Sequence, residues 1–426
     1  MKRVAITTLG CKTNQFESAG MNESLQQQGY HSVPFTEEAD VYIINTCTVT
    51  AKSDAESRKL IRRAAKLNPA AQVVVTGCYA QLAADELSRL PNVSLVIGNS
   101  EKRDIARLLA TAAEGEGTSV AVADISAEST AEPLLLESFA EHTRAFLQIQ
   151  NGCNAFCAYC IVPYARGRSR SVAFDEVLAG VERFAAAGFR EVVLTGIHLG
   201  AYGKDLAGQT DLTALLAEID ASGAVNRLRI GSVEPDEVTP ALIDVIASGR
   251  HICPHLHLPL QSGSDSVLAA MGRGYRSGEI RALIDRLVKV LPDMAIGFDV
   301  IAGFPGESET DHSATCALLQ ELPIAYLHVF PYSSRPGTRA AAMTGHLDPA
   351  VIKARAAELR QIGESKKREY AAKFAGRELP LLIQGGKNGI TPNYLSVSLA
   401  EEAEGEVMVR ITGINRDGSC RGELVK

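Results

Sequence analysis

Short apolar runs alternate with amphipathic segments over residues 1–110. The apolar runs at 4–10, 41–46 and 73–77 have the length and β-branched content of buried strands, and the segments between them carry the period of helices. Alternating strands and helices are typical of a parallel sheet that is covered by helices. We therefore predict an N-terminal α/β domain with a parallel sheet.

A second series of strand–helix units extends over residues 144–346. Helical patterns follow most of its strands, for example at 174–187, 236–247 and 308–322. Repeated parallel units curl into a barrel, but these units are fewer than the usual eight. We predict a partial (β/α)6 barrel, open on one side, with strands at 145–150, 191–197, 227–233, 255–261, 295–304 and 324–332.

The chain changes character after the predicted barrel. Residues 347–373 form a basic helical connection, and residues 374–426 alternate short strand-like runs with glycine-rich turns. The latter pattern predicts a small antiparallel β-barrel, a shape that often binds RNA. Residues 111–143, rich in Ala, Glu, Ser and Thr, are predicted to be mainly a linker, with a short strand at 119–123.

Composition restricts the class of protein. The chain has 426 residues, 46% of them hydrophobic, and a net charge of −7, so any RNA contact must come from local basic patches. No apolar run approaches the ~20 residues that a membrane helix needs, and the N-terminus leads directly into a strand-like run. We expect a cytoplasmic protein without membrane contact, in which nine cysteines serve metal or redox chemistry and not disulfides.

Three cysteines end the three N-terminal strands. Cys11, Cys47 and Cys78 each follow the last residues of an apolar run. The carboxyl ends of parallel strands share one edge of a sheet, so these thiols can converge although they are far apart in sequence. One such cysteine alone is usually a small buried hydrophobe. Three at the same topological position predict a cluster held by three thiolates.

A second set of cysteines is local. Cys153, Cys157 and Cys160 lie within eight residues at the end of the first barrel strand, and the next cysteine is Cys253. Three thiolates on an iron–sulfur cluster leave one iron open to a small-molecule ligand. The alternatives are a zinc knuckle, which normally needs four ligands, or buried thiols. Cys253, Cys316 and Cys420 are isolated, and we expect structural roles for them.

The spacing at residues 153–160 resembles the CxxxCxxC loop of the radical S-adenosylmethionine (SAM) superfamily. The two cysteine sets in this order resemble the radical SAM methylthiotransferase family over essentially the whole chain. Residues 8–18, TLGCKTNQFES, are similar to the subgroup that modifies N6-threonylcarbamoyladenosine beside the tRNA anticodon, where the isopentenyladenosine subgroup has GCQMN and the ribosomal-protein subgroup GCPKN. Residues 257–265, HLPLQSGSD, and 330–338, FPYSSRPGT, also resemble the family.

The resemblance implies an activity and its cofactors. It implies methylthiolation of carbon 2 of N6-threonylcarbamoyladenosine at tRNA position 37. One 4Fe–4S cluster cleaves SAM to form a radical, a second supplies or carries sulfur, and a second SAM methylates it. The resemblance also implies an N-terminal iron–sulfur domain, a radical SAM core and a TRAM-like RNA-binding domain. A low-potential electron donor is implied, and we expect a monomer.

Further residues are candidates for binding. Strand ends and the cysteine loop provide candidates for SAM contact, namely Tyr159, Gly196, Glu234, Gln261, Asp299 and Gly303. His255 and His257 share a strand face, where packing is favoured over metal binding. Arginine suits a carboxylate, so three arginines could contact the threonyl group or instead hold the backbone or the cluster loop, namely Arg166, Arg168 and Arg170. The basic helix offers Lys366, Lys367 and Arg368 to tRNA phosphates.

Other functions remain open at this point. The same chemistry could act on isopentenyladenosine tRNA or on a ribosomal-protein aspartate, although the motif at Lys12, Thr13 and Asn14 speaks against the latter. A radical SAM enzyme with an auxiliary electron-transfer cluster and a non-catalytic iron–sulfur RNA-binding regulator are further alternatives. The sequence does not specify the tRNA species, the sulfur donor or whether a sulfide chain bridges the clusters.

Overall fold

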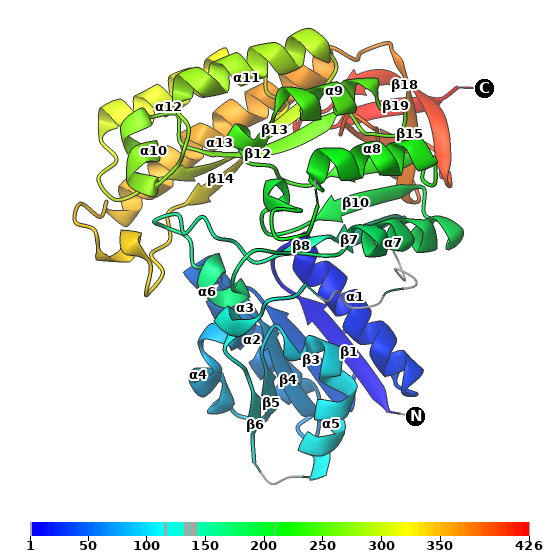
Figure 1. The fold of residues 1–426 in the computed structure, drawn as a ribbon, viewed down its shortest axis with the longest axis vertical. Helices are drawn as coiled ribbons and strands as arrows, with labels where there is room; N and C mark the ends of the chain where they lie inside the picture. Colours follow the sequence, from blue (N-terminus) through cyan, green and yellow to red (C-terminus); the bar gives the residue numbers. More distant parts are fainter. Residues whose placement is uncertain (1, 115–116, 132–135, 137–142, 209, 426) are drawn as a thin grey trace. The chain divides into compact units, whose positions relative to one another are not determined.

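The computed structural model describes the chain in two compact units (Figure 1). The described residues are 2–114, 117–131, 136, 143–208 and 210–425. The first unit comprises residues 1–140, 148–172 and 333–338, and the second comprises 141–147, 173–332 and 339–426. The loop at 148–172 therefore joins the unit that also contains Cys11, Cys47 and Cys78, although it follows the first predicted barrel strand.

Parallel strands form the sheet of the first unit, as predicted. Among its described residues the strand order is β2-β1-β3-β4-β5-β6. The strands are β1 (Arg3–Thr8), β2 (His31–Ser32), β3 (Val41–Thr46), β4 (Gln72–Gly77), β5 (Val93–Ile97) and β6 (Ser119–Ala121). The helices of this sheet are α1 (Lys12–Gln27), α2 (Ala51–Leu67), α3 (Cys78–Leu82), α4 (Ala84–Ser88) and α5 (Ile105–Glu114).

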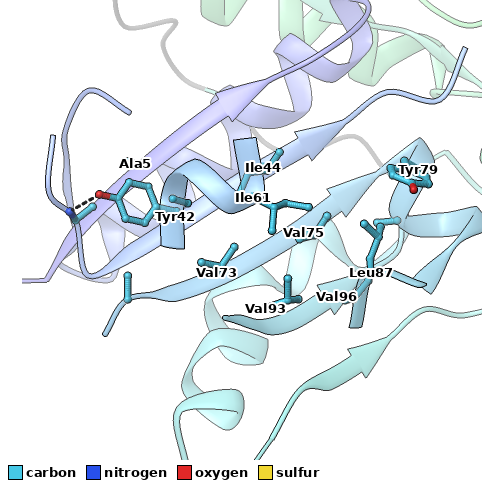
Figure 2. Packing of buried hydrophobic residues seen from close by; sticks show 14 residues of the cluster. Ala5, Tyr42, Ile44, Ile61, Val73, Val75, Tyr79, Leu87, Val93 and Val96 are labelled. Carbon is cyan, nitrogen blue, oxygen red and sulfur yellow. Dashed lines mark hydrogen bonds between the residues drawn. The ribbon is translucent and has the colours of Figure 1, made fainter. Parts of the chain in front are cut away.

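Alternating side chains of β3 supply two separate cores. Tyr42 and Ile44 pack with residues of α2, α3 and α4 on one face, as Figure 2 shows. Val41 and Ile43 pack with residues of α1 and α5 on the other face. A strand that is apolar on both faces belongs in the middle of a helix-covered parallel sheet, and β3 occupies that position.

The predicted linker contains two short regular elements. β6 pairs with β5 and so extends the sheet, and a short 3-10 helix follows at Ile125–Ala127. The rest of residues 111–143 includes 115–116, 132–135 and 137–142, which lie outside the described residues.

The second unit contains the predicted barrel strands. Its described strands form two sheets, β11-β10-β7 and β12-β13-β14. Two isolated parallel bridges, Leu228–Ile252 and Ser232–His257, connect the sheets. The strands are β7 (Arg144–Gln148), whose last residue belongs to the first unit, β10 (Glu191–Thr195), β11 (Arg227–Ile230), β12 (His255–Gln261), β13 (Ala295–Ala302) and β14 (Tyr326–Pro331). The helices that alternate with them are α7 (Phe174–Ala186), α8 (Leu212–Ser222), α9 (Pro240–Ser248), α10 (Asp265–Met271), α11 (Ser277–Val290) and α12 (Glu309–Glu321).

One of these helices begins later than predicted. α9 starts at Pro240 and not at Asp236, because the Thr239 hydroxyl accepts a hydrogen bond from Leu242 N and caps the first turn. Residues Pro235–Glu237 form a separate 3-10 turn.

The C-terminal region forms the predicted small barrel. Its strands close in the order β15-β16-β17-β19-β18, with β15 (Glu378–Gly385), β16 (Asn388–Ile390), β17 (Ser396–Leu399), β18 (Glu406–Ile414) and β19 (Cys420–Leu424). The pairs are antiparallel, as predicted, except β17 with β19, which is parallel. Cys420 is buried in the barrel core.

The basic helix α13 (Pro349–Ala372) is continuous with this barrel. Tyr370 and the following Phe374 belong to the same buried cluster as Leu381 and Val397 of the barrel. This cluster fixes the C-terminal end of α13 to the barrel. No helix among the described residues is both long enough and apolar enough to cross a membrane.

Replacing Ile44 by Ala should destabilise the first unit by about 2–5 kcal/mol, because Ile44 is fully buried and the substitution leaves a cavity. Hydrogen exchange of the β3 and β4 amides measures this change locally. Val49→Ala is the control, since Val49 follows the same strand but is 51% exposed. Equal protection in the two variants would contradict the assignment of this core.

Candidate iron–sulfur centre

The structure brings the three strand-end cysteines together. β1, β3 and β4 are adjacent and parallel, and Cys11, Cys47 and Cys78 follow their last residues at the same edge. Cys11 is exposed, whereas Cys47 and Cys78 are buried. The pKa of the Cys47 thiol is raised to about 11, mainly by burial and to a smaller extent by the neighbouring Cys78 and Cys11. The predicted convergence of these thiols is therefore present in the fold.

Two glycines make this convergence possible. Gly10, with φ +101°, lies so close to Cys47 that a Cβ atom on it would be 2.9 Å from the Cys47 Cβ. Gly77, with φ +96°, lies so close to the preceding strand that its Cβ would be 2.3 Å from the Thr46 carbonyl oxygen. Only glycine suits both the left-handed backbone and the close approach.

Two buried asparagines hold the same turns. The Asn14 amide donates to the carbonyl oxygens of Leu9 at 2.7 Å and Thr46 at 3.1 Å, which bridges the ends of β1 and β3. The Asn45 amide donates to the Asn14 carbonyl oxygen at 2.9 Å. These hydrogen bonds join the turns that carry Cys11 and Cys47.

The local cysteine loop is fixed by backbone contacts. Cys153 N donates to the Gly167 carbonyl oxygen at 3.1 Å, and Ala155 N donates to Cys153 Sγ at 3.4 Å. Gly152 has φ +72°, and a Cβ on it would lie 1.8 Å from the Arg168 carbonyl oxygen. The loop therefore packs directly against the segment that follows α6 (Val162–Arg166).

Arg166 connects this loop to the strand-end cysteines. Its Nε donates to Cys78 Sγ at 3.2 Å, and its terminal nitrogens bond Glu17 and Asn14. Lys102 pairs with the same Glu17 carboxylate, and Glu17, Lys102 and Arg166 are all buried. Burial favours the neutral form of Glu17, but Arg166 and Lys102 outweigh it and lower the pKa of Glu17.

The charges of this network suit an anionic sulfur. With Arg166 and Lys102 protonated and Glu17 ionised, the three groups sum to +1. A net charge is expensive to bury without a counter-charge, and a thiolate at Cys78 supplies one. Burial alone would lower the pKa of Arg166, whereas the charges of Cys78 and Glu17 raise it. Three thiolates with a cation at one sulfur fit a protein-bound iron–sulfur cluster. None of the nine cysteines, all of which are described, forms a disulfide.

The predicted SAM contacts lie in both units. Tyr159 belongs to the cysteine loop, and the other candidates lie in the second unit. Gly196 follows β10, Gln261 ends β12 with φ +65°, and Gly303 follows β13 with φ +78°. Glu234 pairs with Arg273. These residues lie at strand ends, but their contact with SAM stays a prediction.

The two histidines of β12 are packed with aromatic and acidic neighbours. His255 Nε2 and His257 Nδ1 lie 2.8 and 3.0 Å from the Tyr326 hydroxyl. His257 Nε2 lies 2.9 Å from Asp299 Oδ1, and His328 lies 3.1 Å from the same oxygen. Burial raises the pKa of Asp299, but the hydrogen bonds from the two histidines lower it to about 2. Asp299 is therefore already bonded within the protein.

Two of the three arginines predicted to meet the substrate are buried. Arg166 is fully buried, and its guanidinium is bonded to Glu17, Asn14 and Cys78. Arg170 is also buried and donates to the carbonyl oxygens of Arg168 and Arg166. Both hold the backbone and the cluster loop, which is the second of the two roles expected for these arginines. Arg168 is exposed.

The three basic residues of α13 that were expected to contact tRNA phosphates differ in exposure. Lys366 is buried, and its ammonium donates to the Gln320 carbonyl oxygen at 2.5 Å, so it ties α13 to the end of α12. Lys367 is half-buried beside Gly418 of the barrel. Arg368 is exposed, although it donates to the Arg416 carbonyl oxygen at 3.2 Å. Of these three side chains, Arg368 is the most exposed and Lys367 is partly exposed.

Sequence reasoning assigned no roles to the residues that surround the strand-end thiols. These are Gly10, Gly77, Asn14, Asn45, Glu17 and Lys102. The repeated Gly-Cys pair at the ends of β1 and β4 was an available signal for the glycines. Nothing in the local pattern marks Lys102, because its partner Glu17 is 85 positions away.

Comparison with known proteins gives the family. Residues 3–98 match a model described as uncharacterized protein family UPF0004, and residues 147–319 match the radical SAM superfamily. The threonylcarbamoyladenosine tRNA methylthiotransferase MtaB of Aquifex aeolicus is 39% identical over 96% of this chain and 99% of its own length. The corresponding protein of Bacillus subtilis is 38% identical over 93% and 90%. The tRNA-2-methylthio-N(6)-dimethylallyladenosine synthase of Maricaulis maris is 34% identical over 99% and 97%.

A solved structure supports the fold. The radical S-adenosylmethionine methyltransferase TsrM from Kitasatospora setae superposes with a TM-score of 0.59 over 80% of this chain and 77% of its own, at 16% identity. The match of residues 147–319 to the radical SAM superfamily, together with the cysteine loop that they contain, defines a radical SAM protein. The chain belongs to the radical SAM tRNA methylthiotransferase family. Membership implies a 4Fe–4S cluster and SAM as cofactors.

Gly10→Ala should lower the iron content by about half, because the substitution displaces Cys47 and spares the Cys153 loop. Iron per polypeptide and the visible absorption of the clusters measure this loss. Gly29→Ala is the matched control, since Gly29 has φ +82° but no atom within 4 Å of its Cβ position. Loss of iron from the Gly29 variant as well would show that backbone strain alone causes the effect.

Proposed function

We propose that the protein methylthiolates carbon 2 of N6-threonylcarbamoyladenosine at tRNA position 37, beside the anticodon. The observation that carries this proposal is the presence of two three-cysteine sets in one compact unit. One set, Cys153, Cys157 and Cys160, suits the cluster that acts on SAM. The other, Cys11, Cys47 and Cys78, suits a second cluster that handles sulfur.

The substrate is inferred from relatives and from one motif. Relatives named for threonylcarbamoyladenosine are 33–39% identical to this chain. A dimethylallyladenosine synthase is 34% identical, so identity alone does not separate the two substrates. The motif at residues 8–18 favours threonylcarbamoyladenosine.

The chemistry requires a radical. Carbon 2 of adenine carries a hydrogen that no side-chain base removes at useful rates. Cys153, Cys157 and Cys160 would hold a 4Fe–4S cluster, which would supply one-electron chemistry for the reductive cleavage of SAM to a radical able to remove this hydrogen. The protein residues hold the irons through six thiolates, keep the loop fixed through Gly152 and Arg170, and exclude water from Cys47 and Cys78.

Binding roles follow from exposure. Arg168 and Arg368 are exposed and are proposed to contact tRNA, through the threonyl carboxylate and a phosphate respectively. Tyr159, Gly196, Glu234, Gln261, Asp299 and Gly303 remain the proposed SAM residues. The domain order proposed is an iron–sulfur domain, a radical SAM core and a TRAM-like barrel, acting on tRNA in the cytoplasm with a low-potential electron donor.

Replacing Cys11, Cys47 and Cys78 together by Ala should keep reductive SAM cleavage and abolish methylthio product, because only the sulfur-handling set is removed. Liquid chromatography of 5′-deoxyadenosine and mass spectrometry of tRNA nucleosides measure the two outcomes. Cys316→Ala, a buried cysteine outside both sets, is the control. Methylthiolated product from the triple variant would disprove the sulfur role.

Purified enzyme should modify tRNA that carries the threonylcarbamoyl group and should turn over the matched unmodified tRNA at least about tenfold more slowly, since a lost charged contact changes the barrier by more than 1.4 kcal/mol. Nucleoside mass spectrometry after reaction with the two tRNAs, an isopentenyladenosine tRNA and a ribosomal protein provides the measurement. Equal turnover of the unmodified tRNA, or preference for isopentenyladenosine, would overturn the substrate assignment and leave the methylthiolation chemistry intact.

A further inference from the structure

We propose that Arg166 is a positioning residue that tunes the reduction potential of the cluster at Cys11, Cys47 and Cys78. Its contact with Cys78 makes the cluster easier to reduce by one electron, and Glu17 limits this effect. The inference rests on the second cluster of the proposed function.

The Arg166 guanidinium contacts one of the three thiol sulfurs, that of Cys78. The Arg166 Nε lies 3.2 Å from Cys78 Sγ, within the range of an N–H hydrogen bond to sulfur. The other two guanidinium nitrogens are bonded to Glu17 and Asn14, which fixes the plane of the group. Arg166 has no exposed surface, so neither water nor salt screens the interaction.

A hydrogen bond to a cluster sulfur acts differently on the two redox states. Reduction adds one electron from an external one-electron donor, so the reduced cluster is more negative by one charge and no bond forms or breaks. A cation beside a ligand sulfur stabilises the more negative state, which raises the reduction potential. Removing the cation should therefore lower the potential.

Glu17 sets the size of the effect. Its carboxylate accepts from Arg166 and from Lys102, so it offsets part of the positive charge near Cys78. Removing the negative charge of Glu17 leaves the positive charge of Arg166 beside Cys78 without its carboxylate partner and should raise the potential. A purely structural role for the network gives no reason for the Arg166 and Glu17 substitutions to act in opposite directions.

Arg166 also belongs to the segment that carries the other cysteine set. It is the last residue of α6, the helix that follows the Cys153 loop, and Gly167 after it ends the helix with φ +74°. Within the first unit, one side chain therefore connects the segment of one cysteine set to a thiol of the other. The potential of one cluster thus depends on a residue placed by the loop of the other.

The test measures the N-terminal cluster alone. In a full-length chain with Cys153, Cys157 and Cys160 replaced by Ala, a redox titration followed by electron paramagnetic resonance gives its midpoint potential. Adding R166Q should lower the reduced-to-oxidised ratio at a fixed potential about tenfold, which corresponds to a shift of about 59 mV for one electron. Adding E17Q should shift the midpoint upward, and R166K, which keeps the charge, should restore most of the parent value.

Arg62→Gln is the matched control, because Arg62 is an exposed arginine of the same unit and should leave the midpoint unchanged. A midpoint in R166Q equal to that of the parent, or a shift of the same sign in E17Q, would overturn the inference. If R166Q retains no iron, E17Q decides alone, since an upward shift supports the inference and no shift overturns it. A parent chain that binds no iron would overturn both this inference and the second cluster of the proposed function.

Discussion

The first unit depends on one buried ion pair, between Arg166 and Glu17. Glu17 lies on α1, the helix that begins directly after Cys11. Arg166 is the last residue of α6, the helix that follows the Cys153 loop, and lies 149 positions from Glu17 in the sequence. Removing one partner of such a pair typically costs about 3–5 kcal/mol, because it leaves an uncompensated buried charge. The pair therefore holds the Cys153 loop in the unit that carries the other cysteine set, and it does so at the thiol end of the sheet, where Arg166 also reaches Cys78.

Local periodicity predicted the elements that carry the cysteines. The apolar, β-branched run at 41–46 predicted a buried strand, and β3 has the predicted bounds. The convergence of Cys11, Cys47 and Cys78 also followed, because parallel order alone brings strand ends to one edge. The parallel pairing of β17 with β19 did not follow, since short barrel strands carry little register information.

Burial of charge could not be predicted from the sequence. Lysine and arginine are usually exposed, so Arg166, Arg170 and Lys366 were expected at a surface. Each can be buried because its charged group is hydrogen-bonded to a distant residue or to the backbone. The Lys366 ammonium, for example, bonds the carbonyl oxygen of Gln320, 46 positions away. The identity of a side chain does not show which distant group it will pair with. They arise from tertiary contacts, which periodicity does not encode.

The subgroup motif has a meaning that only the structure provides. Thr13 and Asn14 are both 1% exposed, so neither is open to contact by tRNA, and Asn14 instead bridges the turns that hold the thiols. Asparagine occupies this position in all three subgroup motifs compared above, which fits a framework role common to every substrate. The motif thus describes the surroundings of the thiols. Exposed side chains are open to a substrate, and these include Phe156 within the cysteine loop and Tyr164 and Arg168 after it.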